Sequence, residues 1–563
     1  MHWIDWIVIG LYFALIGVVA WWYGRHQKDT KDYFLAGRNA GWITIGASIF
    51  TSNIGSEHIV GLAGQGAVTG MAMAHWELHA WVLIMLAGLF VPFYYKSGVE
   101  TIPEFLEKRY SARTRWILSC VSLVAYVFTK VSVTVYAGAI VFQALLPEVS
   151  LTFGGKTLDA FWIGAFSTVV ITGVYTVFGG MRAIMATATP QAVIILLGSA
   201  IITYIGLDKL GGWGELVSMA RVNAANFALW RPLSDPDFPW LGVLIASPII
   251  GIWYWCTDQY IVQRALSAKD LATARRGALF GGLLKVWPVL IFLIPGMIGW
   301  ALHQKGVIQI PLKMVDGVGV IDGDRVFPTL VTALLPTGIR GLIVACLLAA
   351  LMSSLASLFN SSASLFTVDV YEKLRPGRSD KHLLMVGRLA TVVVVVLGIL
   401  WIPVMAKIAG GGLYQYLQSV QGYLAPPITA VFLLGLFWKR INSAGATWGL
   451  AGGFALGMAK LLIQGVYGKG KVETPAFLAA IGDFNFLYAT GVLMAASIAI
   501  MVVASLLTPP PSEEKIRGLT YGSIHQLGAA EIKASWDWGN KLMVGLILLL
   551  VGGMYLYFSF WLN

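Results

Sequence analysis

Polar and ionisable side chains lie in the middle of segments that are otherwise apolar, and these residues are the ones that can do chemistry. In the stretch from Gly46 to Gly66 the polar residues and glycines cluster: Thr51, Ser52, Asn53, Gly55, Ser56, Glu57 and His58. Such a segment cannot face lipid, so it predicts a discontinuous helix whose freed carbonyls line a cavity. A buried polar contact between close-packed helices is the alternative.

Two ionisable side chains lie inside later apolar segments. Glu77 lies in AHWELHAW, and Lys285 lies in GGLLKVWPVLIFLIPG. A lone lysine inside a membrane span costs roughly 3 kcal/mol on insertion scales, so Lys285 needs a carboxylate, a carbonyl or a hydroxylated ligand. Glu77 is either a site residue or, because it lies near the start of its segment, an interfacial carboxylate.

An aromatic cluster and a set of amides mark two further segments. Trp253, Tyr254 and Trp255 follow a helix that Pro248 and Gly251 weaken, and an aromatic belt at the membrane surface is the alternative. Gln415, Gln418 and Gln421 offer amide donors and acceptors before the helix-distorting Pro426-Pro427. Asp258 and Arg264 are expected to form a structural ion pair with each other.

Serines recur at three- and four-residue spacing between Leu348 and Tyr371, so most of them share one helix face: Ser353, Ser354, Ser357, Ser361 and Ser364. Sodium prefers hard oxygen ligands, as magnesium and calcium do. Adjacent serine hydroxyls opposite an unwound helix can supply such ligands. A serine-rich packing seam is the alternative.

Taken together, these side chains form a polar set of amides, carboxylates, a lysine and aromatic rings. The sequence has no phosphate loop, nucleophile triad or metal-ligand box, so an enzyme is not expected. Neutral polyols suit this set, because polar side chains bind hydroxyls and aromatic faces cover the apolar side of a sugar ring.

The composition of the 563 residues indicates that these segments belong to an all-α membrane protein. The hydrophobic fraction is 57% and the charged fraction 12%, with a mean hydropathy of +0.74. Soluble domains have about 25% charged residues. The net charge of +11 does not indicate nucleic acid, because the basic residues lie in short loops between apolar runs. Three cysteines in apolar runs make structural disulfides unexpected.

Fourteen segments are long and apolar enough to span a bilayer. They begin near Trp3, Gly41, Met71, Trp116, Ala160, Ala183, Trp240, Gly277, Ile339, Leu384, Leu413, Gly445, Phe484 and Leu542. Lysine and arginine concentrate in the loops after odd-numbered segments, so the positive-inside rule predicts that both termini lie outside. Residues 509–540 are expected to form a polar cytoplasmic loop or a partly disordered segment.

Several long stretches resemble the sodium:solute symporter family, specifically its sodium/glucose cotransporter branch. The most specific are SNIGSEHIVGLAG, TIPEFLEKRY, WYWCTDQYIVQRALSAKD, MSSLASLFNSSASLFTVDVY and VFLLGLFWKR. The resemblance implies a LeuT-type core of two inverted five-helix repeats with flanking helices. It divides the chain into a first helix and loop (1–40), a transport core (41–440) and additional C-terminal helices (441–563). It also implies sodium-coupled import of a sugar by alternating access.

The resemblance also implies which residues bind. The sugar residues map onto Asn53, His58, Glu77, Tyr254, Trp255, Lys285 and Gln418, with Tyr414 and Trp76 as outer aromatic cover and Tyr254 as an inner gate. The sodium site maps onto the carbonyls of Thr51, Ile54 and Ala350 and the hydroxyls of Ser353 and Ser354.

Departures from the family pattern refine these expectations. Ala188 stands where the family usually carries an aspartate linked to a second sodium, and Ala356 replaces a neighbouring threonine, so one sodium per sugar is expected. Gln415 replaces an acidic residue of some members, which leaves the sugar open between a hexose and another polyol such as myo-inositol. A sugar sensor that does not transport is a further alternative. Glu57, the short loops and the few cysteines favour a bacterial inner membrane, with the protein a monomer or weak oligomer.

Overall fold

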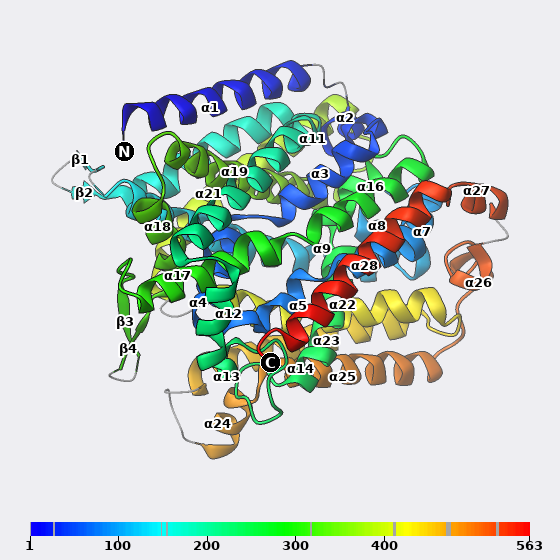
Figure 1. Ribbon diagram of the computed structural model, residues 1–563. Coiled ribbons are helices and arrows are strands. Elements are labelled where there is room, and N and C mark those ends of the chain that lie inside the picture. Colours follow the sequence, from blue (N-terminus) through cyan, green and yellow to red (C-terminus); the bar gives the residue numbers. More distant parts are fainter. Residues whose placement is uncertain are drawn as a thin grey trace.

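The chain folds into a bundle of long helices (Figure 1). The computed structural model describes residues 2–25, 27, 29–147, 149–153, 156–315, 318–408, 413–468, 475–524 and 528–563. The first third of the chain contains α1 (Trp3–Gly24), α2 (Thr30–Leu35), η1 (Ala36–Arg38), α3 (Trp42–Asn53), η2 (Glu57–Leu62), α4 (Ala63–Thr69), η3 (Gly70–Met73), α5 (Ala74–Glu77), α6 (Ala80–Met85), η4 (Leu86–Phe90), α7 (Val91–Ser97), α8 (Ile102–Arg109), α9 (Ala112–Ala125), η5 (Tyr126–Val131) and α10 (Ser132–Leu145), where η marks 3₁₀ or π turns.

The middle and C-terminal parts continue the bundle. They contain α11 (Ala160–Leu210), α12 (Trp213–Val222), α13 (Ala224–Phe227), α14 (Trp240–Ile252), η6 (Trp253–Thr257), α15 (Gln259–Leu266), α16 (Leu271–Lys285), η7 (Val289–Leu293), α17 (Ile294–Gln304), α18 (Gly323–Leu334), α19 (Ile339–Ser364), η8 (Leu365–Tyr371), α20 (Glu372–Leu374), α21 (Asp380–Ile408), α22 (Leu413–Phe437), α23 (Ser443–Tyr467), α24 (Ala476–Asp483), α25 (Phe486–Leu506), η9 (Glu513–Lys515), α26 (Tyr521–Ile524), α27 (Ala529–Ala534) and α28 (Trp538–Phe560).

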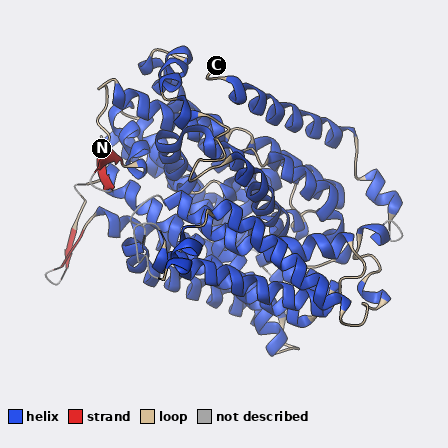
Figure 2. Ribbon diagram, turned by 90° about the horizontal axis from the view of Figure 1, so that it is seen from below, coloured by secondary structure: helices blue, strands red, loops and turns tan. Residues whose placement is uncertain are grey.

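Strands among the described residues are confined to two short antiparallel hairpins (Figure 2). In the first, β1 (Leu151–Phe153) pairs with β2 (Lys156–Leu158), and Leu151 lies opposite Leu158. In the second, β3 (Leu312–Val315) pairs with β4 (Val318–Ile321), and Leu312 lies opposite Ile321. Both hairpins lie at one side of the bundle, whereas α26 and α27 lie at the opposite side (Figure 1). This separation fits loops that alternate between the two faces of a membrane.

Twelve apolar helical segments of the described chain are long enough to cross a membrane, so the expected count of fourteen is not confirmed by this measure. Two of the twelve contain a glycine with positive φ. Gly180 (φ 52°, ψ −160°) divides α11, and Gly70 (φ 60°, ψ −132°) separates α4 from the helices that follow. If each of these two segments counts as two spans, the total becomes fourteen. That total stays a prediction.

Residues 509–540, which the sequence suggested as an irregular loop, are partly ordered. Their described residues include η9, α26 and α27, and α26 packs against α22. The expected polar loop therefore contains three short helical elements, and its partial disorder stays a prediction.

Inner and outer helices differ sharply in burial, and this difference determines where polar side chains can lie. In the apolar window of the segment Ile339–Leu374, 94% of the residues are buried, against 17% in Trp538–Phe560. Helix α3 packs against α11, α16 and α19, and α11 also packs against α19. Polar residues on the inner helices therefore meet protein rather than lipid, which is the condition for a site at membrane depth.

Candidate functional site

The second apolar segment is broken, as its polar and glycine-rich sequence predicted. Helix α3 ends at Asn53, Ile54 has an extended backbone (φ −83°, ψ 93°), and η2 begins at Glu57. Gly55 leaves room for the Glu57 carboxylate, since a Cβ at this position would lie 2.3 Å from Glu57 Oε2. No backbone N–H of the described residues donates to the carbonyl oxygens of Thr51 or Ile54. The break thus frees carbonyl groups inside the bundle.

Eight of the nine residues expected to bind substrate line one central cavity: Asn53, His58, Trp76, Glu77, Tyr254, Trp255, Lys285 and Gln418. The ninth, Tyr414, belongs to α22, but its side chain lies outside the described residues. The free space in the cavity is about 50 Å³, which is room for a few water molecules. The cavity therefore brings together residues, such as Asn53 and Gln418, that lie more than 350 positions apart along the chain.

Glu77 and Lys285 form a buried ion pair at the cavity. Lys285 Nζ lies 2.5 Å from Glu77 Oε2, and the side chains are 2% and 1% exposed. The lysine ammonium also lies 5.6 Å from the centre of the Trp255 ring. Glu77 is therefore not an interfacial carboxylate, and the partner that Lys285 required is this residue.

A hydrogen-bonded group lies beside that pair. Asn53 Nδ2 donates to the Tyr254 hydroxyl at 3.1 Å and lies 3.4 Å from His58 Nε2. His58 Nε2 is also 3.8 Å from Glu77 Oε1. The contacts connect the broken helix, the aromatic cluster of η6 and the Glu77–Lys285 pair.

Four buried polar atoms of the cavity lining have no hydrogen-bond partner among the described residues. They are Asn53 Oδ1, Glu57 Oε2, Trp76 Nε1 and Gln418 Oε1. A buried polar atom without a partner costs roughly 1 to 3 kcal/mol. Three acceptors and one donor that converge on a cavity therefore indicate a polar ligand with several hydrogen-bonding groups.

A second buried lysine, Lys130, also lines the cavity, and the sequence reasoning missed it. Its Nζ lies 2.5 Å from Asp258 Oδ2. Four aromatic rings surround the ammonium at 4.7 to 5.1 Å from their centres: Tyr126, Trp253, Tyr254 and Tyr260. We call this group the Lys130 cage. The signal that could have revealed it is the lone lysine in the apolar run AYVFTKVSV, the same signal that identified Lys285.

The cage shows that the expected Asp258–Arg264 ion pair is wrong. Asp258 accepts from Lys130 and from the Tyr126 hydroxyl. Arg264 instead donates through Nη1 to the carbonyl of Tyr260. The spacing of six residues gave no information about Lys130, which lies 128 residues earlier in the chain.

The five residues expected to bind sodium are all buried, where α3 packs against α19. Thr51 and Ile54 lie at the break, and Ala350, Ser353 and Ser354 lie on α19. Ser353 Oγ has no hydrogen-bond partner among the described residues. Ser354 Oγ donates to the carbonyl of Ser52 at 2.8 Å and lies 3.0 Å from the Tyr260 hydroxyl. Ser354 therefore connects α19 to the end of α3 beside the break.

The two alanines from which a single sodium is expected are buried on packed helices, Ala188 on α11 and Ala356 on α19. The hydroxyl of the neighbouring Thr187 donates to the Ala183 carbonyl at 2.9 Å and lies 2.6 Å from the Tyr175 hydroxyl. This hydroxyl is therefore engaged with protein rather than free for an ion. Ala188 itself offers no side-chain oxygen.

A model of the sodium:solute symporter family matches residues 33–453. The chain belongs to this family. It is similar to sodium/glucose cotransporter 4 of Danio rerio, at 38% identity with 92% of this chain and 81% of the relative covered. It is also similar to sodium/myo-inositol cotransporter of Homo sapiens (37%, covering 94% and 76%) and sodium/glucose cotransporter 1 of Ovis aries (39%, covering 90% and 79%).

Solved structures show the fold of this symporter. A Na⁺-coupled sialic acid symporter in a substrate-bound outward-open state matches with a TM-score of 0.74 at 20% identity, covering 91% of this chain and 99% of that one. MhsT in complex with L-phenylalanine matches with a TM-score of 0.50 at 14% identity, covering 82% and 99%. The fold is thus the LeuT type, and the protein is a sodium-coupled membrane symporter rather than an enzyme.

Proposed function

We propose that this symporter imports a hexose such as glucose or galactose together with sodium by alternating access. The observation that carries the proposal is the set of unpartnered polar atoms on Asn53, Glu57, Trp76 and Gln418 around a cavity with aromatic walls. A neutral polyol offers a donor and an acceptor at every hydroxyl, and aromatic faces cover the apolar side of its ring. Relatives named sodium/glucose cotransporters support the same substrate class.

Each of the nine residues expected to bind the sugar has a proposed role. Asn53, His58, Glu77, Lys285 and Gln418 bind sugar hydroxyls, whereas Trp255, Trp76 and Tyr414 provide aromatic cover and Tyr254 acts as the inner gate. A hexose needs more room than about 50 Å³. Entry of the sugar therefore requires lining side chains to separate, beginning with the Asn53–Tyr254 hydrogen bond.

Import of myo-inositol is the second candidate, because relatives named sodium/myo-inositol cotransporters are 37% identical to this chain, almost as similar as the glucose cotransporters. An uptake panel of glucose, galactose and myo-inositol into proteoliposomes tests the choice. We expect a hexose to give the highest kcat/KM, with myo-inositol a weak competitor. A higher kcat/KM for myo-inositol contradicts the hexose proposal and leaves sodium-coupled polyol symport intact.

For the ion, we propose one sodium per sugar, bound by the carbonyls of Thr51, Ile54 and Ala350 and the hydroxyls of Ser353 and Ser354. The unpartnered Ser353 Oγ and the free carbonyls at the helix break support this site. Ala188 and Ala356 support the absence of a second one. Simultaneous measurement of charge and sugar uptake is expected to give one charge per sugar, and a ratio near two contradicts the proposal.

The remaining proposals concern organisation and location. We propose that the transport core spans residues 41–440, between a first helix and loop (1–40) and additional C-terminal helices (441–563). The protein lies in a bacterial inner membrane with both termini outside, as a monomer or weak oligomer. A sugar sensor remains the alternative of a different class, and it predicts sugar binding without accumulation.

A further inference from the structure

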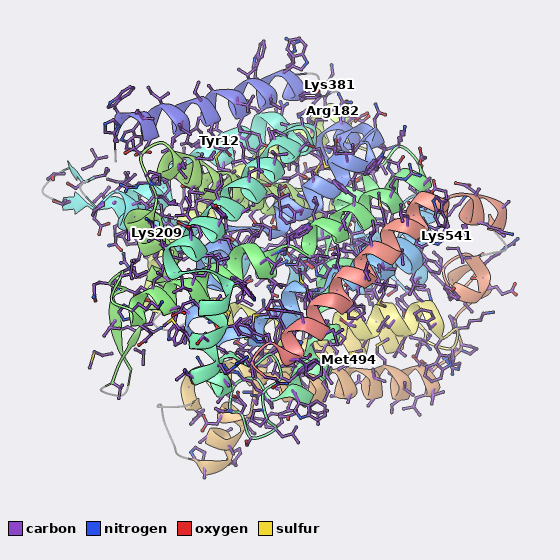
Figure 3. The ribbon with its side chains drawn as sticks, viewed as in Figure 1. Tyr12, Arg182, Lys209, Lys381, Met494 and Lys541 are labelled. Carbon is purple, nitrogen blue, oxygen red and sulfur yellow. The ribbon has the colours of Figure 1, made fainter. Side chains whose placement is uncertain are left out.

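A second hollow, of about 390 Å³, lies at the side of the bundle that carries α26 and α27, away from the sugar cavity. Part of the lining comes from the end of an apolar span, where η4 contributes Gly88 and Leu89 and α7 contributes Pro92 and Phe93. The rest of the lining includes three cations, Arg275, Lys533 and Lys541, together with the ring of Trp536. The hollow is therefore lined by both apolar and cationic side chains. Figure 3 shows Lys541 at the start of α28, close to α27.

Arg275 is built into this hollow rather than lying loosely on its surface. The residue is 3% exposed, and its guanidinium lies 5.1 Å from the centre of the Trp536 ring. Nη1 donates to the Ile532 carbonyl and to Ser535 Oγ, both at 2.8 Å. Nε, however, has no hydrogen-bond partner among the described residues. A buried guanidinium with an unused donor calls for an acceptor.

The carboxylates of this segment do not neutralise the three cations. Glu531 pairs with Lys96, and Asp537 pairs with Arg276. Within the described chain, no carboxylate forms an ion pair with Arg275, Lys533 or Lys541. The hollow therefore carries an excess positive charge together with apolar side chains.

We propose that this hollow binds the headgroup of an anionic glycerophospholipid, with the phosphate facing Arg275, Lys533 and Lys541 and the glycerol and first acyl carbons against Pro92 and Phe93. Basic pockets between spanning helices suit such headgroups, and each basic residue near the membrane surface adds roughly 1 kcal/mol, or about fivefold in affinity. The apolar part of the lining selects a lipid over a free anion, because inorganic phosphate gains nothing from it. The site is independent of the sugar proposal.

The test is native mass spectrometry of the full-length protein in detergent, titrated with phosphatidylglycerol or with phosphatidylcholine. The test variant is Lys533→Gln/Lys541→Gln. Both side chains are exposed, so the fold tolerates the change. The matched control is Lys209→Gln/Lys381→Gln, which removes the same charge from exposed positions that lie away from Lys541 (Figure 3).

We expect the wild type to bind phosphatidylglycerol in preference to phosphatidylcholine. The Lys533→Gln/Lys541→Gln variant should bind phosphatidylglycerol about 30-fold more weakly, and the control should change less than about twofold. Equal losses in both variants, or equal binding of the two lipids by the wild type, overturn the proposal. Displacement of phosphatidylglycerol by inorganic phosphate overturns it too, because the site would then bind a free anion.

Discussion

Two buried lysine–carboxylate pairs border the same cavity, and they differ in what surrounds them. Lys285 and Glu77 lie against one tryptophan ring, beside polar atoms that lack partners. Lys130 and Asp258 are enclosed by four aromatic rings, and Asp258 also accepts from a tyrosine hydroxyl. Both pairs are buried and both lysines line the cavity, so the difference lies in their neighbours: polar atoms without partners beside Lys285, and aromatic rings around Lys130.

The two pairs also connect to different parts of the proposed mechanism. The Lys285 side joins the sugar cavity through His58 and Glu77. The Lys130 cage joins the sodium side, because the ring of Tyr260 lies against Lys130 while its hydroxyl contacts Ser354 Oγ and the Ser52 carbonyl. We infer that the first pair serves sugar binding, whereas the second holds the aromatic residues in place beside the ion site.

The largest expected effect comes from breaking the Lys130–Asp258 pair, whose ammonium is surrounded by four aromatic rings. Asp258→Asn leaves the Lys130 charge uncompensated inside four rings, so the free energy of unfolding should fall by about 3 to 5 kcal/mol. A thermal-unfolding assay by size-exclusion chromatography measures this loss. A second variant, Lys130→Met/Asp258→Leu, removes both charges and should recover much of the stability. An Asp258→Asn protein as stable as the wild type contradicts the structural role of the cage.

Breaking the Lys285–Glu77 pair should lower sugar affinity more than it lowers stability. Lys285→Ala removes a charged hydrogen-bond donor, which is worth about 1.5 to 3 kcal/mol, so the Kd for sugar should rise roughly 10- to 150-fold. The loss of stability should be smaller than for Asp258→Asn, because His58 remains 3.8 Å from Glu77 Oε1 when the lysine is removed. Sugar-dependent tryptophan fluorescence measures the affinity. If sugar affinity is unchanged, Lys285 does not belong to the sugar site.

The sodium side is tested by Ser354→Ala. Loss of one hydroxyl ligand should weaken sodium binding, and reciprocal linkage should lower the apparent sugar affinity at fixed sodium by about fivefold or more. Sodium titration of sugar uptake gives both values. Ser362→Ala is the matched control, since this serine is also buried on α19 without a hydrogen-bond partner for Oγ but lies about 12 Å further along the helix. The same sodium shift in both variants would place the ion elsewhere.

The smallest expected effect is that of Gln418→Ala. This change removes one neutral hydrogen-bonding group of the cavity, worth about 0.5 to 1.5 kcal/mol, so sugar affinity should fall roughly 2- to 12-fold. Sodium binding measured without sugar should stay as in the wild type. A change in sodium affinity as large as the change in sugar affinity would remove the distinction between the two sides of the site.

The sequence predicted the features that depend on local composition. The apolar segments and the loop charges indicated many membrane helices, and the glycines beside Asn53 and Glu57 indicated the break that α3 and η2 show. The lone charge of Lys285 indicated a buried partner. These predictions follow from the cost of polar groups in lipid, which acts on each segment separately.

The sequence did not predict which distant groups meet. Glu77 and Lys285 lie 208 residues apart, and nothing local pairs them. Asp258 was assigned to the nearby Arg264, whereas the fold brings it Lys130 from another helix. The number of spans also depends on where Gly70 and Gly180 break long helices, because composition does not separate two consecutive spans from one long kinked helix.

Gradient-driven uptake into proteoliposomes tests the central claim most directly. With purified protein and an inward sodium gradient, radiolabelled glucose or galactose should accumulate above its external concentration. The accumulation should disappear when potassium replaces sodium. Sugar that binds without accumulating would contradict symport and indicate a sensor, and accumulation that is indifferent to sodium would contradict the coupling.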